Sequence, residues 1–334
     1  MPEGQNFRHL LLRVVLLTLG IQFAGFLVLL PDMIRLTGPL QGARYALLHA
    51  VMAFGNAGFG LWPDGVARLA PLSLLTLMLL VVLGSTGFIG LDELDRYFYG
   101  RFRRQTPLPG LSAQTRVGLK VTTCLLVGGA LLFALLEWHR PGTLGPLDPP
   151  HKLLHAAFQT TVTRSAGFST LDYGHFSAPT LLLIMSLMFV GGNPGSTAGG
   201  IKTTVLAVLL SATRATLRGQ PQAQLEGRAI PVRTLMRALT VVTLALLAVG
   251  LGTGALMFTD HQHRPIVLAF EAVSAFTTSG LSVNLTPVLS DHGKLVLVAL
   301  MFLGRVGFLS LLLAFHTTHA IVDELPEEQA FNID

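Results

Sequence analysis

Three short glycine-containing segments are the part of this sequence whose residue types and spacing could do chemistry. They read HAVMAFGNAGF (49–59), FQTTVTRSAGF (158–168) and FEAVSAFTTSGL (270–281). Glycine lets a backbone leave the ordinary dihedral angles without a steric penalty, and backbone carbonyls presented in this way can replace the water shell of a cation. The pattern therefore predicts a ring of neutral oxygens that suits a monovalent cation.

The residues next to each glycine are small, which would let the three strands approach a common axis. The glycines recur about every 110 residues, as expected for an internal repeat rather than for isolated helix-packing glycines. We expect the coordinating residues to be Asn56, Ala57, Gly58, Ser165, Ala166, Gly167, Thr278, Ser279 and Gly280.

A second glycine-rich stretch interrupts an apolar segment and predicts an unwound loop. An unwound backbone at membrane depth is tolerated only where it faces a cavity inside the protein, so we expect it to act as a gate below the filter. Its predicted residues are Gly191, Gly192, Asn193, Pro194, Gly195, Ser196, Thr197, Ala198, Gly199, Gly200 and Lys202. A phosphate-binding loop is the alternative, but Ile201 separates the last glycine from the lysine and no strand precedes the stretch.

Arg305 is the one arginine predicted in the middle of an apolar span. An arginine at that depth is costly unless it faces a polar interior, so we expect it to face the pore beside the gate. Two acids stay open at this stage: Asp172 and Glu271 either attract cations to the outer mouth or are solvated or helix-capping residues.

The composition indicates that membrane-embedded elements position these residues. Of 334 residues, 51% are hydrophobic and only 12% are charged, against about 25% charged in a typical soluble domain. The net charge of +5 comes from basic residues between the apolar segments, which favours membrane topology over nucleic-acid binding. The single cysteine, Cys124, is expected to be a small packing residue.

Six apolar stretches are long enough to span a bilayer, which takes about 20 residues. They are 10–30, 69–91, 117–136, 180–210 (interrupted), 235–258 and 295–315. Three shorter apolar segments, 44–54, 152–161 and 267–276, each lead into a glycine motif and are too short to cross. We therefore predict an all-α polytopic membrane protein with three helix–pore helix–helix repeats at 1–98, 99–218 and 219–334.

Lys and Arg concentrate in the loops after the second and fourth spans, which predicts that these loops are cytoplasmic. Both termini, including the acidic tail 323–334, are then cytoplasmic as well. Trp62 and Trp138 fall near the opposite face, where an aromatic belt would place them.

The glycine motifs, the stretch Gly191–Lys202 and the MFLGRVG run at 301–307 together resemble the Trk/Ktr/HKT family of potassium transporters, and the Ktr membrane subunit most of all. The resemblance covers nearly the whole chain. It implies potassium uptake through a filter at Gly58, Gly167 and Gly280, a gating loop at 191–202 and a cavity arginine at Arg305. It further implies a homodimer in the cell inner membrane that works with a cytosolic nucleotide-binding ring subunit and binds no organic cofactor. Whether Na+ accompanies K+ stays open.

Two departures from the family pattern bear on this expectation. The family has four pore repeats and the three motifs correspond to the second, third and fourth, so we expect a first repeat to be lacking. Phe308 also stands where the family has proline. The alternative functions are a non-conducting or regulatory membrane protein of the same family, and a membrane enzyme. The near absence of acids in the spans disfavours the enzyme.

Overall fold

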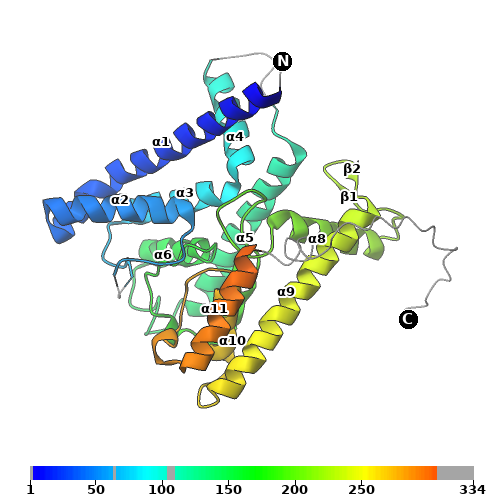
Figure 1. The fold of residues 1–334 in the computed structure, drawn as a ribbon. Helices are drawn as coiled ribbons and strands as arrows, with labels where there is room; N and C mark the ends of the chain where they lie inside the picture. The colour runs from blue at the N-terminus through cyan, green and yellow to red at the C-terminus, as the bar shows by residue number, and fades with distance from the viewer. Residues whose placement is uncertain (1–2, 63–64, 104–109, 307–334) are drawn as a thin grey trace.

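The computed structural model describes residues 3–62, 65–103 and 110–306, and Figure 1 shows that nearly all of the described elements are helices. The helices are α1 (Glu3–Thr37), α2 (Pro39–Gly55), α3 (Pro71–Thr86), α4 (Phe88–Phe102), α5 (Ala113–Glu137), α6 (Pro149–Val162), α7 (Ala178–Phe189), α8 (Thr203–Leu217), α9 (Val232–Thr259), α10 (Pro265–Phe276) and α11 (Asp291–Val306). Two 3-10 turns, Tyr173–His175 and Thr286–Val288, and the strands β1 (Gln224–Leu225) and β2 (Arg228–Ala229) complete the set.

The chain repeats one order of elements three times: a long helix, a short helix, a glycine loop and another helix. The units are α1–α2–α3, α5–α6–α7 and α9–α10–α11. Each short helix starts with a proline, at Pro39, Pro149 and Pro265, because proline suits the first helical turn, where its missing N–H is not needed. The short segments predicted from the sequence correspond to α2, α6 and α10.

Three of the described helices are long and apolar enough to cross a membrane: α1, α5 and α9. A fourth is added if the bent pair α3 and α4 counts as one span. The pair differs from the continuous span predicted at 69–91, because the chain turns by 110° at Gly87. Gly87 has a φ of 87°, and a side chain there would lie 2.5 Å from the carbonyl oxygen of Pro194, so the bend needs glycine and packs directly against the segment 191–202.

A carboxylate at the end of the first helix in each unit caps the last helix of the same unit. Asp32 accepts a hydrogen bond from the N–H of Ala70 at 2.7 Å. Asp260 accepts one from the N–H of Ser290 at 2.7 Å, and Glu137 accepts one from the N–H of Ser177 at 3.2 Å. Since the first turn of a helix has free N–H groups and a partial positive charge, each acid ties the first and last helices of its unit together.

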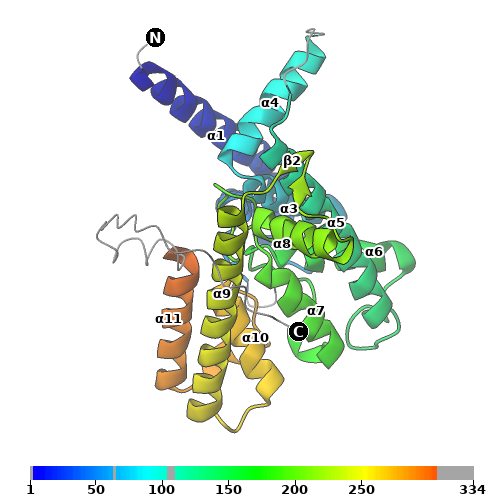
Figure 2. The same ribbon diagram turned by 90° about the vertical axis from the view of Figure 1, so that its right-hand side faces the viewer.

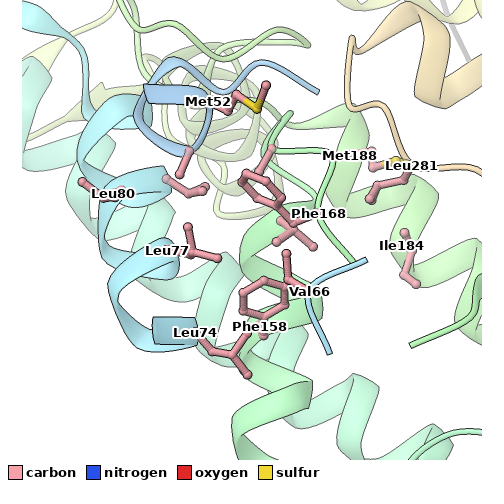
Figure 3. Close-up of a cluster of buried hydrophobic side chains, with 14 of the residues drawn as sticks. Met52, Val66, Leu74, Leu77, Leu80, Phe158, Phe168, Ile184, Met188 and Leu281 are labelled. Carbon is pink, nitrogen blue, oxygen red and sulfur yellow. The ribbon is translucent and has the colours of Figure 1, made fainter. Parts of the chain in front are cut away.

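The largest buried cluster lies between the first two units. In Figure 3, Phe158 of α6 and Phe168 of the second glycine loop lie within it, near Leu74 and Leu77 of α3. Phe158 and Phe168 are fully buried. The cluster packs directly behind the second loop and so fixes where that loop can lie.

A small β-hairpin is an addition to the all-helical expectation. Its turn residues Glu226 and Gly227 have φ values of 50° and 73°, as a tight two-residue hairpin turn requires. The carboxylate of Glu226 pairs with Lys120 and Arg116 of α5, and these contacts lower its pKa. Figure 2 shows the hairpin beside α8 and α5.

One sequence-based expectation is wrong, and others concern residues outside the described ranges. Cys124 is exposed on α5, so the expectation that it packs internally is wrong. The end of the last predicted span, Phe308 and the acidic tail lie outside the described residues.

Candidate functional site

The three glycine loops share one unusual backbone conformation. In each, the glycine and the residue two before it have positive φ angles: 46° and 79° at Asn56 and Gly58, 63° and 71° at Ser165 and Gly167, and 52° and 72° at Thr278 and Gly280. Left-handed conformations of residues other than glycine carry strain and cluster at functional sites. A carbonyl filter needs a backbone that departs from the regular helical and extended conformations, and these loops have such a backbone.

The three loops meet, although more than 100 residues separate each glycine from the next. A Cβ added to Gly167 would lie 2.1 Å from the carbonyl carbon of Gly58, and one added to Gly280 would lie 1.5 Å from the carbonyl oxygen of Gly58. One added to Gly58 would lie 2.9 Å from the carbonyl oxygen of Thr278. The contact leaves no room for a side chain at any of these positions, so glycine is required by packing as well as by φ.

Each loop follows directly from the carboxyl end of its short helix. The helices α2, α6 and α10 end at Gly55, Val162 and Phe276, within four residues of the filter glycine in two units and five in the other. The carboxyl end of a helix carries a partial negative charge. Three such ends beside the meeting point of the loops favour a cation there.

Cavities lie on two sides of the meeting point. One, of about 470 Å³, is lined by Gly167 and Gly280 together with Trp62 and Tyr173. The other is a groove of about 770 Å³ that runs along the first and third loops and reaches Arg305. The first cavity and the groove both border Gly280, Leu281 and Ser282, so the groove lies along one side of the meeting point and extends from there to Arg305.

The predicted gate residues form a closed loop between α7 and α8. The N–H of Gly191 donates to the carbonyl of Ile201 at 2.8 Å, and the N–H of Thr203 donates to the carbonyl of Gly192 at 3.1 Å. A side chain on Gly191 would strike the carbonyl of Gly199. The glycines thus let the two ends of the break pair with each other, which satisfies backbone groups that the interrupted helix leaves free.

This loop lies directly against the glycine loops. Thr197 donates its hydroxyl to the carbonyl of Phe54 at 3.1 Å and accepts a bond from Asn56 at 2.9 Å. The N–H of Gly199 donates to the hydroxyl of Ser165 at 3.1 Å. A Cβ on Gly199 would lie 2.4 Å from the carbonyl oxygen of Thr277. The loop therefore contacts all three units at the base of the glycine loops.

Two cationic side chains, one from α11 and one from the loop itself, bind carbonyls of the loop. Arg305 donates to the carbonyl of Thr197 at 2.8 Å, and Lys202 donates to the carbonyl of Ala198 at 2.8 Å. The structure thus brings the residue predicted on the last helix to the predicted loop, as the sequence-based hypothesis requires. Asn193 fixes the far side of the loop through a bond to the carbonyl of Thr86 at 3.1 Å.

Sequence reasoning missed the roles of two buried charged residues. Arg164 is fully buried and donates to the carbonyl of Gly191 at 3.1 Å, so it ties the second glycine loop to the segment 191–202. Glu271 is only 3% exposed, which rules out a solvated carboxylate. For Glu271 the available signal was a charged residue inside an otherwise apolar short helix, and for Arg164 it was an arginine next to the second glycine motif.

The sequence relatives of the chain are cation transport proteins. A family model described as TrkH, cation transport protein, matches residues 3–321. The chain is 34% identical over 318 residues to the Ktr system potassium uptake protein B of Bacillus subtilis (strain 168), a match that spans 95% of this chain and 69% of that protein. It is also 34% identical to the potassium/sodium uptake protein NtpJ of Enterococcus hirae, over 93% of this chain and 68% of that protein.

A solved structure has a similar fold. The crystal structure of the potassium transporter TrkH from Vibrio parahaemolyticus matches 90% of this chain with a TM-score of 0.68 at 16% sequence identity. The match spans 62% of that chain. At this identity the likeness supports the fold alone.

Proposed function

Because this chain belongs to the TrkH family of cation transport proteins, we propose that it forms part of a potassium-conducting pore in the cell membrane. The family is one of transporters rather than enzymes, and its apolar helices make the chain a multi-pass membrane protein. Potassium is proposed as the substrate because relatives at 34% identity are named for potassium uptake.

The observation that carries the proposal is the threefold repetition of one backbone conformation at one place. Positive φ angles recur at matching positions in three loops, and the three glycines touch. A K+ ion stripped of water needs oxygens at fixed positions, and carbonyls of Asn56–Gly58, Ser165–Gly167 and Thr278–Gly280 are the proposed source. Each of the units 1–98, 99–218 and 219–334 supplies one such strand.

We propose that residues 191–202 are the gate. In the conformation described, the loop lies against all three filter strands, and Arg305 and Lys202 both bind its carbonyls. Two positive charges beneath the filter oppose a cation in the same space. Conduction then requires the loop to leave Ser165 and Asn56, which moves Lys202 away from the ion path and breaks the bond between Thr197 and Arg305.

The groove along the first and third loops is the proposed place for a fourth pore segment. It is lined by the filter residues Asn56–Gly58 and Gly280, so the side of the filter between these two strands is open within the described part of the chain. A further strand of carbonyls there would complete the ring. A homodimer and a cytosolic nucleotide-binding ring subunit remain proposals that rest on the family resemblance.

Rubidium tracer uptake into proteoliposomes tests the proposal. Vesicles that contain the chain should take up rubidium, and potassium should compete more strongly than sodium. If well-folded protein gives no uptake alone, uptake should appear when a first pore repeat from a relative is co-reconstituted. Absence of uptake in both cases would overturn the conducting function and favour a regulatory membrane protein.

A further inference from the structure

In the second and third units, one polar side chain of the short helix is bonded to the strand that leaves the filter. Glu271 of α10 accepts bonds from the hydroxyl of Ser282 at 2.6 Å, the N–H of Val283 at 3.1 Å and the hydroxyl of Thr286 at 2.7 Å. Gln159 of α6 accepts a bond from the Tyr173 hydroxyl at 2.9 Å.

The two sets of contacts occupy equivalent positions. Gln159 precedes its glycine by eight residues and Glu271 precedes its own by nine, and both meet a hydroxyl six residues after the glycine. Gln159 also donates to Ser169 at 3.5 Å, and Ser169 and Ser282 both lie two residues after their glycines. Two independent copies of one arrangement indicate a shared task.

The first unit uses a different contact for the same strand. His49, nine residues before Gly58, is buried, and its ring lies 4.9 Å from that of Trp62. Trp62 is in the strand that follows Gly58. A ring contact is less directional than a carboxylate bound by three donors, so the third unit has the most firmly held exit strand.

Building on the proposed pore, we propose that Glu271 is a positioning residue that holds residues 282–286 against α10 and thereby sets the position of the Gly280 carbonyl. Ser282 is only two residues beyond Gly280, so its position restricts the filter strand. Binding sites discriminate between similar ligands only when their geometry is held to within about 0.5 Å. Gln159 has the same role in the second unit.

The geometry favours this role over attraction of cations by the free charge. All three donors point at the Glu271 carboxylate, and the side chain is almost fully buried. A buried carboxylate with its acceptor sites occupied acts mainly through those bonds. Glu271→Gln keeps an acceptor and removes the charge, whereas Glu271→Ala removes both, so the two variants separate the roles.

A thiol placed on the held strand reports its order without any need for transport. In a Cys124→Ser background, Val283→Cys supplies a single thiol, and its rate of alkylation is measured in detergent. Adding Glu271→Ala should speed alkylation about tenfold or more, since hydrogen bonds contribute about 1 kcal/mol each and three are lost. Glu271→Gln should stay within about threefold of the parent. The exposed Asp291, whose side chain is 99% accessible, provides the control variant Asp291→Asn.

Rubidium uptake in the same variants tests the consequence for the filter. Glu271→Ala should reduce the preference for potassium over sodium as competitor, and Glu271→Gln should retain it. Unchanged alkylation in Glu271→Ala overturns the positioning role, and so does an equal loss of preference in both variants. If Glu271→Ala fails to fold, Thr286→Val replaces it, with a smaller expected rise in alkylation. If alkylation is faster but the protein never takes up rubidium, the positioning role of Glu271 is supported and the proposed pore is contradicted.

Discussion

At the scale of single residues, the filter glycines are constrained twice over. Their positive φ angles disfavour any side chain, and neighbouring backbone occupies the space where a side chain would go. Other glycines are not constrained in this way: a Cβ on Gly128 of α5 would meet nothing within 4 Å. Replacing a glycine should therefore disturb the structure in the three glycine loops but not at Gly128.

Gly167→Ser should change the potassium-to-sodium preference of rubidium uptake, because its Cβ would push the backbone of Gly58 aside. Competition by the two cations in proteoliposomes measures the effect. Gly128→Ala is the matched control and should behave as the parent does. An unaltered preference in Gly167→Ser would remove this residue from the filter.

Arg305→Gln should increase rubidium uptake. The substitution weakens the bond to the Thr197 carbonyl and removes one of the two positive charges beneath the filter strands. A charge-assisted hydrogen bond is worth about 1.5–3 kcal/mol. The ratio of closed to open conformations of the loop 191–202 should therefore fall about tenfold or more. Initial uptake rates check this, with Arg305→Lys expected to lie between parent and Gln. Uptake at or below the parental rate would show that Arg305 does not hold the gate closed.

At the scale of elements, one acid near the carboxyl end of each of α1, α5 and α9 holds the first and last helices of its unit together. Glu137 is the most heavily bonded: it accepts from the backbone and hydroxyl of Ser177 and from the hydroxyls of Thr180 and Thr143. Each unit is thereby closed around its own short helix. The position of the glycine loop in each unit therefore depends on the bonds that this acid makes.

Glu137→Gln should lower the stability of the protein by about 1–3 kcal/mol, because a buried carboxylate with several donors is replaced by an amide that also presents donors. Thermal unfolding in detergent measures the change. Asp291→Asn, on an exposed acid in the first turn of α11, should lower the midpoint by much less, because its charge is solvated. Equal midpoints for both variants would mean that the cap does not stabilise the unit.

In the third unit, the carboxylate of Asp260 that caps α11 predicts how the stability of the protein changes with pH. Burial raises the pKa of Asp260, but bonds from Ser290 and Thr259 outweigh it, and the pKa lies below its ordinary value of 3.8. A carboxyl whose folded pKa is depressed stabilises the fold above its unfolded pKa and loses that contribution as the pH falls through the folded value. Thermal unfolding of the parent and Asp260→Asn across a pH series should therefore give separate midpoints at neutral pH that converge only in strong acid. A difference that stays constant down to strong acid would show that ionisation of Asp260 does not stabilise the cap.

At the scale of the whole molecule, the arrangement predicts which surfaces face each side of the membrane. The hairpin and α8 follow the gate loop, whereas the turn between α9 and α10 lies at the other end of α9 (Figure 1). Lys and Arg gather at the hairpin end, which indicates the cytoplasmic side. The two ends of α9 should thus lie in different compartments.

Single cysteines in the Cys124→Ser background test this orientation in whole cells. Gln222→Cys, in the exposed segment before β1, should react with a membrane-impermeant reagent only after lysis. His261→Cys, in the exposed turn after α9, should react in intact cells. The reverse pattern would invert the proposed direction of uptake.

The sequence by itself determined the class of the protein and predicted which residues form its functional site. Apolar length marks spans, proline and glycine mark breaks, and a motif that recurs three times marks a repeat, because these signals are local. The filter triplets, the loop 191–202 and Arg305 could therefore be named from local patterns of residue type. The threefold repeat of the glycine motif also predicted that the three loops meet at one place.

Only the tertiary structure decided which distant groups bind one another. The bend at Gly87 packs against Pro194, more than 100 residues later, and the N–H of Phe88 donates to the carbonyl of Gly195. Arg164 binds Gly191, and the carboxylate of Glu271 faces three donors beyond the filter, through contacts that no local pattern encodes. A buried polar group must find its partner wherever packing brings one, and packing is a property of the whole chain.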